Sequence, residues 1–139
     1  MTSQLNIRCA VYIRVNVAGR ATASDAARGQ RDATRAFIQS RRLHGWTCVG
    51  TYEDIGHSGG TLERPALRRL LADMNAGMVD CVVIHSFDRL TRNMDDQVDI
   101  IAEFWRHDVT LVTVSPVKFV VVSTKVRDSS AEIPRTRGA

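Results

Sequence analysis

Residues 7–15, IRCAVYIRV, form an apolar and β-branched run that two arginines interrupt, and the run leads directly into Asn16. Such a run is typical of a buried strand in a parallel sheet. Working outward from it, we expect further strands at 46–54, 81–86 and 109–114. The small and polar residues 16–25 are expected to form a loop. We expect helices from Ala26 to about His44, from Pro65 to the residue before Gly77, and over 94–108 with Val98, Ile101 and Phe104 or Trp105 turned inward.

Strands that alternate with helices predict an α/β fold, in which one domain holds a mostly parallel sheet of four to five strands with helices on both faces. Residues 1–115 form this domain in our interpretation. Residues 116–139 have little apolar periodicity beyond a possible edge strand, and we expect a divergent, poorly ordered tail. Ligands in such folds bind at the carboxyl ends of the strands. The polar residues at those ends are Arg14, Asn16, Ser58, Arg64, Asp88, Arg89 and Arg92.

Composition narrows the class of protein and its partners. The formal net charge is +4, from 19 basic and 15 acidic residues, and only two of the basic residues are lysines. Arginine suits phosphate recognition better than lysine, although a GC-rich coding sequence also produces arginine. Cys9, Cys48 and Cys81 fall in strand-like runs without metal-site spacing, which predicts reduced core cysteines and a cytoplasmic location. No stretch is long and apolar enough for a membrane span.

Arginines from three separate loops are predicted to converge on one oxyanion such as a phosphate, since guanidinium groups aimed at one point repel each other without an anion. These arginines are Arg14, Arg64 and Arg89 or Arg92. Asp88 either orients an arginine or accepts a proton from a leaving hydroxyl. The alternative is that the arginines pair with nearby carboxylates and that Asp88 only caps a helix. The candidate carboxylates are Asp54, Glu63 and Asp88.

A second kind of chemistry is suggested by GHSGG at 56–60, which matches the G-x-S-x-G turn of α/β-hydrolases, with His85 and His107 following. That motif requires a tight strand-to-helix turn at Ser58, whereas the next helix is expected only near Pro65. A flexible glycine-rich connection is the preferred interpretation. Neither a zinc-site spacing nor a nucleotide-binding glycine motif is present, so no cofactor and no metal is indicated.

Taken in chain order, YIRVN, Gln30, YEDIGHSGGTLERPALRRLLADMNAG and FDRLTRN resemble the serine recombinases, a family of resolvases, invertases and large integrases of phages and transposons. The resemblance spans residues 8 to about 115. It implies a catalytic domain that cuts and rejoins DNA without metal or ATP: a serine attacks the backbone phosphate, forms a 5′-phosphoserine link and frees a 3′-hydroxyl. By position it assigns Arg14, Arg64, Arg89 and Arg92 to the phosphate clamp, Asp88 to the family's acid, and Tyr12, Gln30 and Ser58 to supporting positions.

Two departures from the family pattern change the expected activity. Asn16 occupies the position of the nucleophilic serine, and an amide nitrogen with a delocalised lone pair is a poor nucleophile, so we expect cleavage to be lost. After the fourth strand no long dimer helix or DNA-binding domain is recognisable, which we interpret as truncation or a reading-frame change with weak DNA binding. The alternatives are a non-catalytic partner or inhibitor of a full-length recombinase, by association or self-association, and, more remotely, a Ser58-dependent hydrolase.

Overall fold

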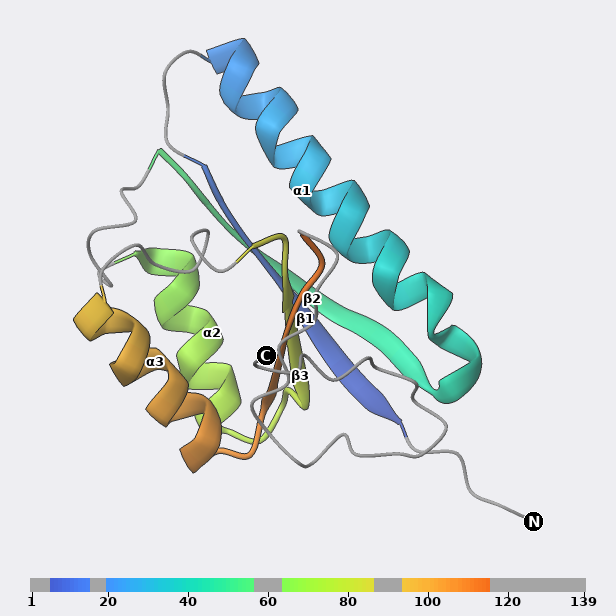
Figure 1. Cartoon of the computed structure of the whole chain (residues 1–139), viewed down its shortest axis with the longest axis vertical. Coiled ribbons are helices and arrows are strands. Elements are labelled where there is room, and N and C mark those ends of the chain that lie inside the picture. Colours follow the sequence, from blue (N-terminus) through green and yellow to red (C-terminus); the bar gives the residue numbers. More distant parts are fainter. Residues whose placement is uncertain (1–5, 16–19, 57–63, 87–93, 116–139) are drawn as a thin grey trace, which may run out of the picture.

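The computed structural model describes residues 6–15, 20–56, 64–86 and 94–115, and the side chains of 20–24 and 94–97 are not part of that description (Figure 1). Strands and helices alternate along the chain. Their bounds are β1 (Ile7–Val15), α1 (Arg20–Ser40), the 3-10 turn η1 (Arg42–His44), β2 (Trp46–Ile55), α2 (Pro65–Asn75), β3 (Cys81–Ile84), α3 (Met94–Arg106) and β4 (Thr110–Thr113). None of these helices is long and apolar enough to cross a membrane.

The four strands form one parallel sheet in the order β2-β1-β3-β4, which confirms the predicted α/β fold. β1 pairs with β2 along its whole length, and the last residues of the pair are Val15 and Ile55. β3 is shorter and ends at Ile84, which lies opposite Tyr12. The last turn of β1 therefore extends beyond its neighbour β3, and this offset shapes the carboxyl end of the sheet.

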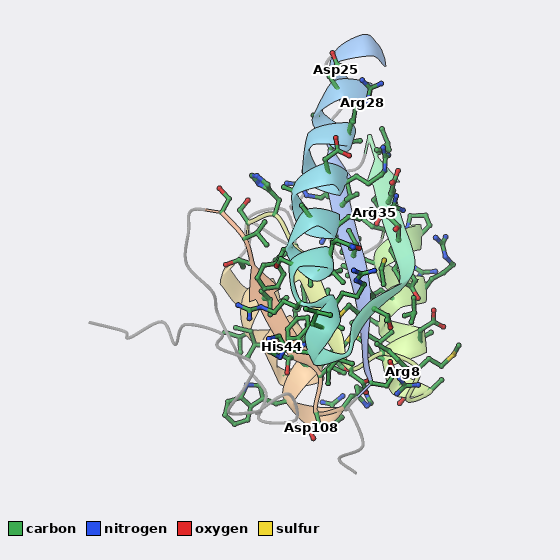
Figure 2. All side chains as sticks on the ribbon, turned by 90° about the vertical axis from the view of Figure 1, so that its right-hand side faces the viewer. Arg8, Asp25, Arg28, Arg35, His44 and Asp108 are labelled. Atoms are coloured by element: carbon green, nitrogen blue, oxygen red, sulfur yellow. The ribbon has the colours of Figure 1, made fainter. Side chains whose placement is uncertain are left out.

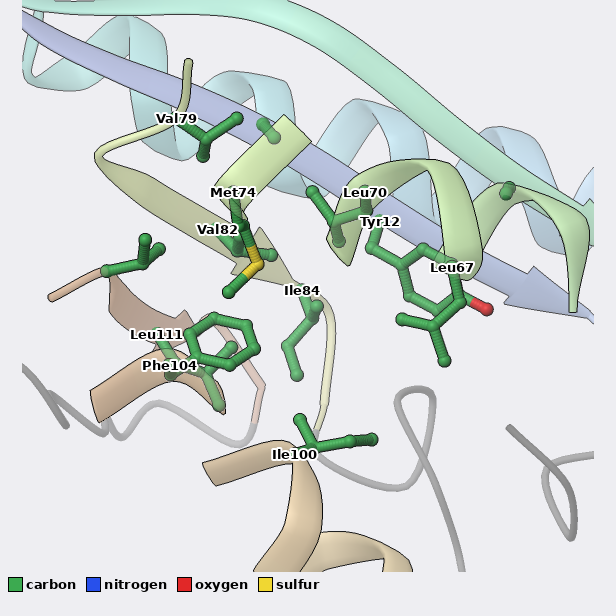
Figure 3. Packing of buried hydrophobic residues seen from close by; sticks show 13 residues of the cluster. Tyr12, Leu67, Leu70, Met74, Val79, Val82, Ile84, Ile100, Phe104 and Leu111 are labelled. Atoms are coloured by element: carbon green, nitrogen blue, oxygen red, sulfur yellow. The ribbon is translucent and has the colours of Figure 1, made fainter. Parts of the chain in front are cut away.

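Helices cover both faces of the sheet, as the sequence predicts (Figure 1). α1 packs on the face that carries Cys9, Val11 and Ile13. α2 and α3 pack on the other face, and Figure 3 shows their buried side chains against the strands. The residues of this second cluster include Tyr12, Leu67, Leu70, Met74, Ile84, Ile100 and Phe104. The two clusters explain the continuous apolar runs of β1 and β3, because both faces of these strands are buried.

α1 begins at Arg20, whereas the sequence interpretation placed 16–25 in a loop and began the helix near Ala26. That prediction was wrong because small polar residues were given more weight than the alanines at 21, 23, 26 and 27, which favour a helix. The inner face of α1 recurs with helical spacing. Its buried residues are Ala27, Gln30, Thr34 and Ile38. The helix is followed by η1, and Gly45 ends that turn with a positive φ of 91°.

Two predictions about burial also need correction. On α3, Ile100 and Phe104 face the core, while Val98 and Trp105 are exposed. The prediction was correct in offering Phe104 and wrong for Val98, and Ile100 is fully buried where Ile101 was expected, because the adjacent apolar pairs 100–101 and 104–105 leave the phase of the buried face open. Cys48 is exposed as well, since it lies on the edge strand β2, whereas Cys9 and Cys81 are buried as expected.

Candidate active site at the carboxyl ends of β1 and β2

Arg14 and Asp54 are neighbours on adjacent strands, one residue before the ends of β1 and β2. Residues paired in a parallel ladder point to the same face, and here the face is the one that α2 covers. Tyr12 lies two residues earlier on β1 and points the same way. All three side chains are buried, with Tyr12 and Arg14 fully inaccessible and Asp54 2% exposed. The polar residues that interrupt the first strand therefore face the interior.

Asp54 connects the end of β2 to the start of α2. Its Oδ2 accepts hydrogen bonds from the Tyr12 hydroxyl at 2.8 Å and from the Leu67 backbone N–H at 3.0 Å. Its Oδ1 accepts one from the Ala66 backbone N–H at 2.9 Å. The helix has no N-cap bond of its own, because the side chain of Arg64 does not cap it. A carboxylate from another element thus satisfies the first free N–H groups of α2 and complements the positive end of the helix.

Sequence reasoning missed this role of Asp54 and considered it only as a partner for an arginine. A signal was present in the chain. An acidic residue ends a strand, and the next helix begins with proline but has no Ser, Thr, Asp or Asn before it. The free N–H groups of such a helix start need a hydrogen-bond acceptor from another part of the chain.

Arg64 occupies the position immediately before Pro65 and is fully buried. Its extended backbone, with φ −122° and ψ 128°, is the conformation that a following proline favours. The guanidinium carbon lies 5.6 Å from the centre of the Tyr12 ring, which is within the range of a cation–π contact. Arg64 and Arg14 thus approach Tyr12 from different elements, one before α2 and one on β1. The structure brings together two of the arginines that the sequence predicted to converge.

Gln30 reaches this end of the sheet from α1. Its Nε2 donates to the Arg14 carbonyl oxygen at 3.0 Å, and its Oε1 accepts from the Arg14 N–H at 3.4 Å. Within the described part of the chain, the β3-side edge of β1 has no ladder partner at Arg14, because β3 ends opposite Tyr12. The side-chain amide of Gln30 takes the place of the missing strand and fixes the backbone that carries Arg14.

Burial raises the pKa of Tyr12 well above its usual range, and its hydrogen bond to the Asp54 carboxylate acts in the same direction. The positive charges of Arg64 and Arg14 oppose this shift without reversing it. The hydroxyl of Tyr12 is therefore protonated at neutral pH and acts as the donor to Asp54. Tyr12 holds the acid that organises α2 and does not serve as a base.

The remaining predicted site residues lie outside the described part of the chain. They are Asn16, Ser58, Asp88, Arg89 and Arg92. Glu63, one of the carboxylates considered as an arginine partner, lies outside it too. Among the described residues, no group of three or more His, Cys, Asp or Glu side chains is placed to hold a metal ion.

The two histidines of the hydrolase alternative lie at opposite ends of the sheet. His85 follows β3 directly, at the carboxyl end. His107 follows α3 and precedes β4, so it lies at the amino end, where it contacts Glu103 at 3.3 Å. Of these two histidines, only His85 lies at the carboxyl end of the sheet, where β2 ends before the segment that contains Ser58.

Comparison with known proteins agrees with this architecture. The family model described as the resolvase N-terminal domain matches residues 9–129, which is most of the chain. The fold, the ordered motifs and this match define a serine recombinase catalytic domain. The chain belongs to the resolvase family.

Individual relatives show the same relationship. A putative DNA recombinase of Bacillus subtilis (strain 168) is 32% identical over 106 residues, which cover 76% of this chain but 20% of that protein. The chain thus spans about a fifth of the length of this relative. The crystal structure of the N-terminal catalytic domain of TP901-1 integrase is 27% identical, with a TM-score of 0.69 and coverage of 81% of both chains. The C-terminal catalytic domain of ISC1926 TnpA, an IS607-like serine recombinase, is 26% identical with a TM-score of 0.67, covering 78% of this chain and 69% of that one.

Proposed function

We propose that this domain holds a backbone phosphate of DNA at the carboxyl ends of β1 and β2, and that it does not cleave the DNA. The observation that carries the proposal is the burial of Arg14 and Arg64 beside Tyr12, in a frame fixed by Asp54 and Gln30. Guanidinium groups are costly to bury and match the oxygens of a phosphodiester in geometry and charge. The oxygens of Asp54 already accept three hydrogen bonds from Tyr12 and α2.

The proposed roles follow from these positions and from family membership. Arg14 and Arg64, together with Arg89 and Arg92, neutralise the phosphate, and Asp88 is the acid of the same site. Tyr12, Gln30 and Ser58 support them. In this family a serine oxygen attacks phosphorus and the 3′-oxygen leaves. Asn16 stands at the position of that serine one residue beyond β1 and has no oxygen nucleophile to supply, so the covalent step is absent.

The test is a search for covalent protein–DNA product after incubation with supercoiled DNA that bears candidate sites, stopped with detergent. The wild-type chain is expected to give none, and any adduct would overturn the claim that cleavage is lost. Asn16→Ser restores a hydroxyl and is expected to give an adduct. Adding Arg64→Gln to Asn16→Ser should abolish that adduct, whereas the exposed Arg68→Gln, four residues along the chain, is the matched control that should not. Failure of Asn16→Ser to react would count against an intact phosphate clamp.

The alternative function is binding to a full-length serine recombinase. One observation favours it: Val98 and Trp105 lie seven residues apart on α3 and are 63% and 68% exposed. An exposed tryptophan that shares a helix face with another exposed apolar residue two turns away is typical of a protein contact. Size-exclusion chromatography with a full-length relative tests this reading. A shift in elution that Trp105→Ala removes would support it, and unchanged elution would exclude it.

A further inference from the structure

The charge of the chain is divided between its segments. Residues 1–44 contain eight arginines and two aspartates, for a net charge of +6. Residues 45–115 contain six arginines and eleven acidic residues, for a net charge of −5. The first segment supplies β1 and α1, whereas the second supplies α2 and α3. β1 carries two of these arginines, Arg8 and Arg14, while α1 and the turn after it carry the other six together with both aspartates, for a net charge of +4 on the part of the chain that covers one face of the sheet.

Two arginines of α1 form an outward row. Arg28 and Arg35 are both exposed and lie seven residues apart, which is two helical turns and a rise of about 10 Å. Figure 2 shows both side chains on the side of α1 that borders β2. We call Arg28 and Arg35 the basic row of α1. Seven-residue spacing keeps them on one face of the helix, and the exposed Asp32 lies between them on that face.

Contacts with β2 hold this part of α1 in a defined position. The Nη2 of Arg35 donates to the Thr51 Oγ1 at 2.8 Å. Between the two members of the basic row, the Nε of Arg31 donates to the Glu53 Oε2 at 2.8 Å. Anchored arginines lose less side-chain freedom when they bind a ligand. Glu53 is engaged by Arg31, and the row itself remains on the exposed surface.

The basic row begins near the end of the sheet that holds the proposed phosphate site, although α1 lies on the opposite face of β1 from the Arg14 side chain. α1 starts close to the ends of β1 and β2, and Gln30, two residues after Arg28, bonds the backbone of Arg14 (Figure 1). From there the helix runs toward the opposite end of the sheet, where η1 ends before β2 begins. A polyanion bound at the carboxyl end can therefore follow α1, which carries four arginines and two aspartates, whereas α3 carries one arginine and four acidic residues.

We propose that the basic row of α1 is a second surface for the duplex DNA backbone, which begins near the phosphate site and is separate from it in its residues. The rise between Arg28 and Arg35 corresponds to about three base pairs of DNA at 3.4 Å each along one strand. The choice of DNA as the polyanion rests on the proposed function. The contact is to phosphate and carries no base specificity.

The test is binding of the full chain to a fluorescent 30-base-pair duplex of arbitrary sequence, followed by anisotropy from 50 to 200 mM KCl. Arg28→Gln with Arg35→Gln is compared with Arg68→Gln with Arg69→Gln, which removes two exposed arginines from α2 on the opposite face. The α1 variant is expected to bind several-fold more weakly and to lower the slope of log K against log salt by about 1.8, at about 0.9 for each lost phosphate contact. The α2 variant is expected to keep most of the wild-type affinity and slope.

Equal losses in both variants would overturn the inference, because they would show a general charge effect. Absence of salt-dependent binding by the wild-type chain would overturn it as well. Urea midpoints check that both variants are folded, and Arg28→Gln alone, which leaves the contact between Arg35 and Thr51 intact, is the fallback. The proposed function fails separately, through the covalent-product assay, since Arg14 and Arg64 are unchanged in these variants.

Discussion

The two ends of the sheet use the same residue types for different purposes. At the amino end, Arg8 of β1 binds Asp80, the residue before β3, through its backbone N–H, its Nε and its Nη2, at 2.9, 3.0 and 3.1 Å. At the carboxyl end, Asp54 binds the hydroxyl of Tyr12 and two backbone N–H groups of α2. Asp80 at the amino end therefore pairs with an arginine, whereas Asp54 at the carboxyl end caps the start of α2.

The arginines at the two ends of the sheet also differ in their exposure to solvent. Arg8 is partly exposed, and its Nε and Nη2 both donate to the Asp80 carboxylate, which raises the pKa of Arg8. This pair joins β1 to the start of β3 and has a structural role. Arg14 and Arg64 are fully buried, and the guanidinium group of Arg64 lies over the ring of Tyr12. Two buried guanidinium groups near one aromatic ring are the arrangement on which we base the proposed phosphate site.

The largest expected effect on stability comes from Asp54→Ala. It leaves two N–H groups of α2 and the Tyr12 hydroxyl without their buried acceptor, so we expect the free energy of unfolding to fall by about 3 kcal/mol. Urea unfolding followed by circular dichroism measures the change. Asp54→Asn keeps one acceptor oxygen and should lose less. A loss below 1 kcal/mol for Asp54→Ala would mean that this acid does not organise the carboxyl end.

Asp80→Ala should cost less, about 1–2 kcal/mol, because the Arg8 side chain remains partly accessible to water after its partner is removed. The same urea titration gives the value. Arg106→Ala, which removes an exposed pair with Glu103 on α3, is the control and should change stability by less than about 0.5 kcal/mol. If Asp80→Ala were more damaging than Asp54→Ala, the contrast between the two ends would be reversed.

Tyr12→Phe removes a buried hydrogen bond and should cost about 1 kcal/mol at pH 7. It should also change the response to alkali. The pKa of Tyr12 is raised in the folded chain, so above about pH 10 the unfolded chain loses a proton that the folded chain retains, and stability falls as pH rises. Unfolding midpoints from pH 9 to pH 11 should fall less steeply for Tyr12→Phe than for the wild type. Parallel curves would contradict this assignment.

The smallest effect is expected for Tyr52→Phe. Tyr52 of β2 donates to Asp73 of α2 between the two ends of the sheet, and its hydroxyl is partly accessible. Partial burial, and then the bond to Asp73, raise the pKa of Tyr52 to about 12, so its contribution also declines as pH rises above 10. We expect a loss of about 0.5 kcal/mol at pH 7 by urea unfolding. A loss as large as that of Tyr12→Phe would show that the carboxyl end has no special role.

Sequence periodicity predicted the four strands, their helices and the end of the sheet that holds Arg14 and Arg64. These features follow from local patterns, since apolar runs, prolines and glycines act over a few residues. The buried face of α3 could not be predicted from the sequence, because Ile100 and Ile101 are equally apolar. Only packing against β3 and β4 selects Ile100. The role of Asp54 as a hydrogen-bond acceptor could not be predicted for a related reason. It connects β2 to the N–H groups of Ala66 and Leu67, which lie twelve and thirteen positions further along the chain.

The central claim, a phosphate site at the carboxyl end, is tested most directly by the thermal midpoint of unfolding in inorganic phosphate against chloride at equal ionic strength. A ligand that binds only the folded chain raises the midpoint. We predict that phosphate raises it for the wild type and for Arg68→Gln, each against its own value in chloride, and does not raise it for Arg64→Gln. An equal rise in Arg64→Gln, or no rise in the wild type, would contradict the account.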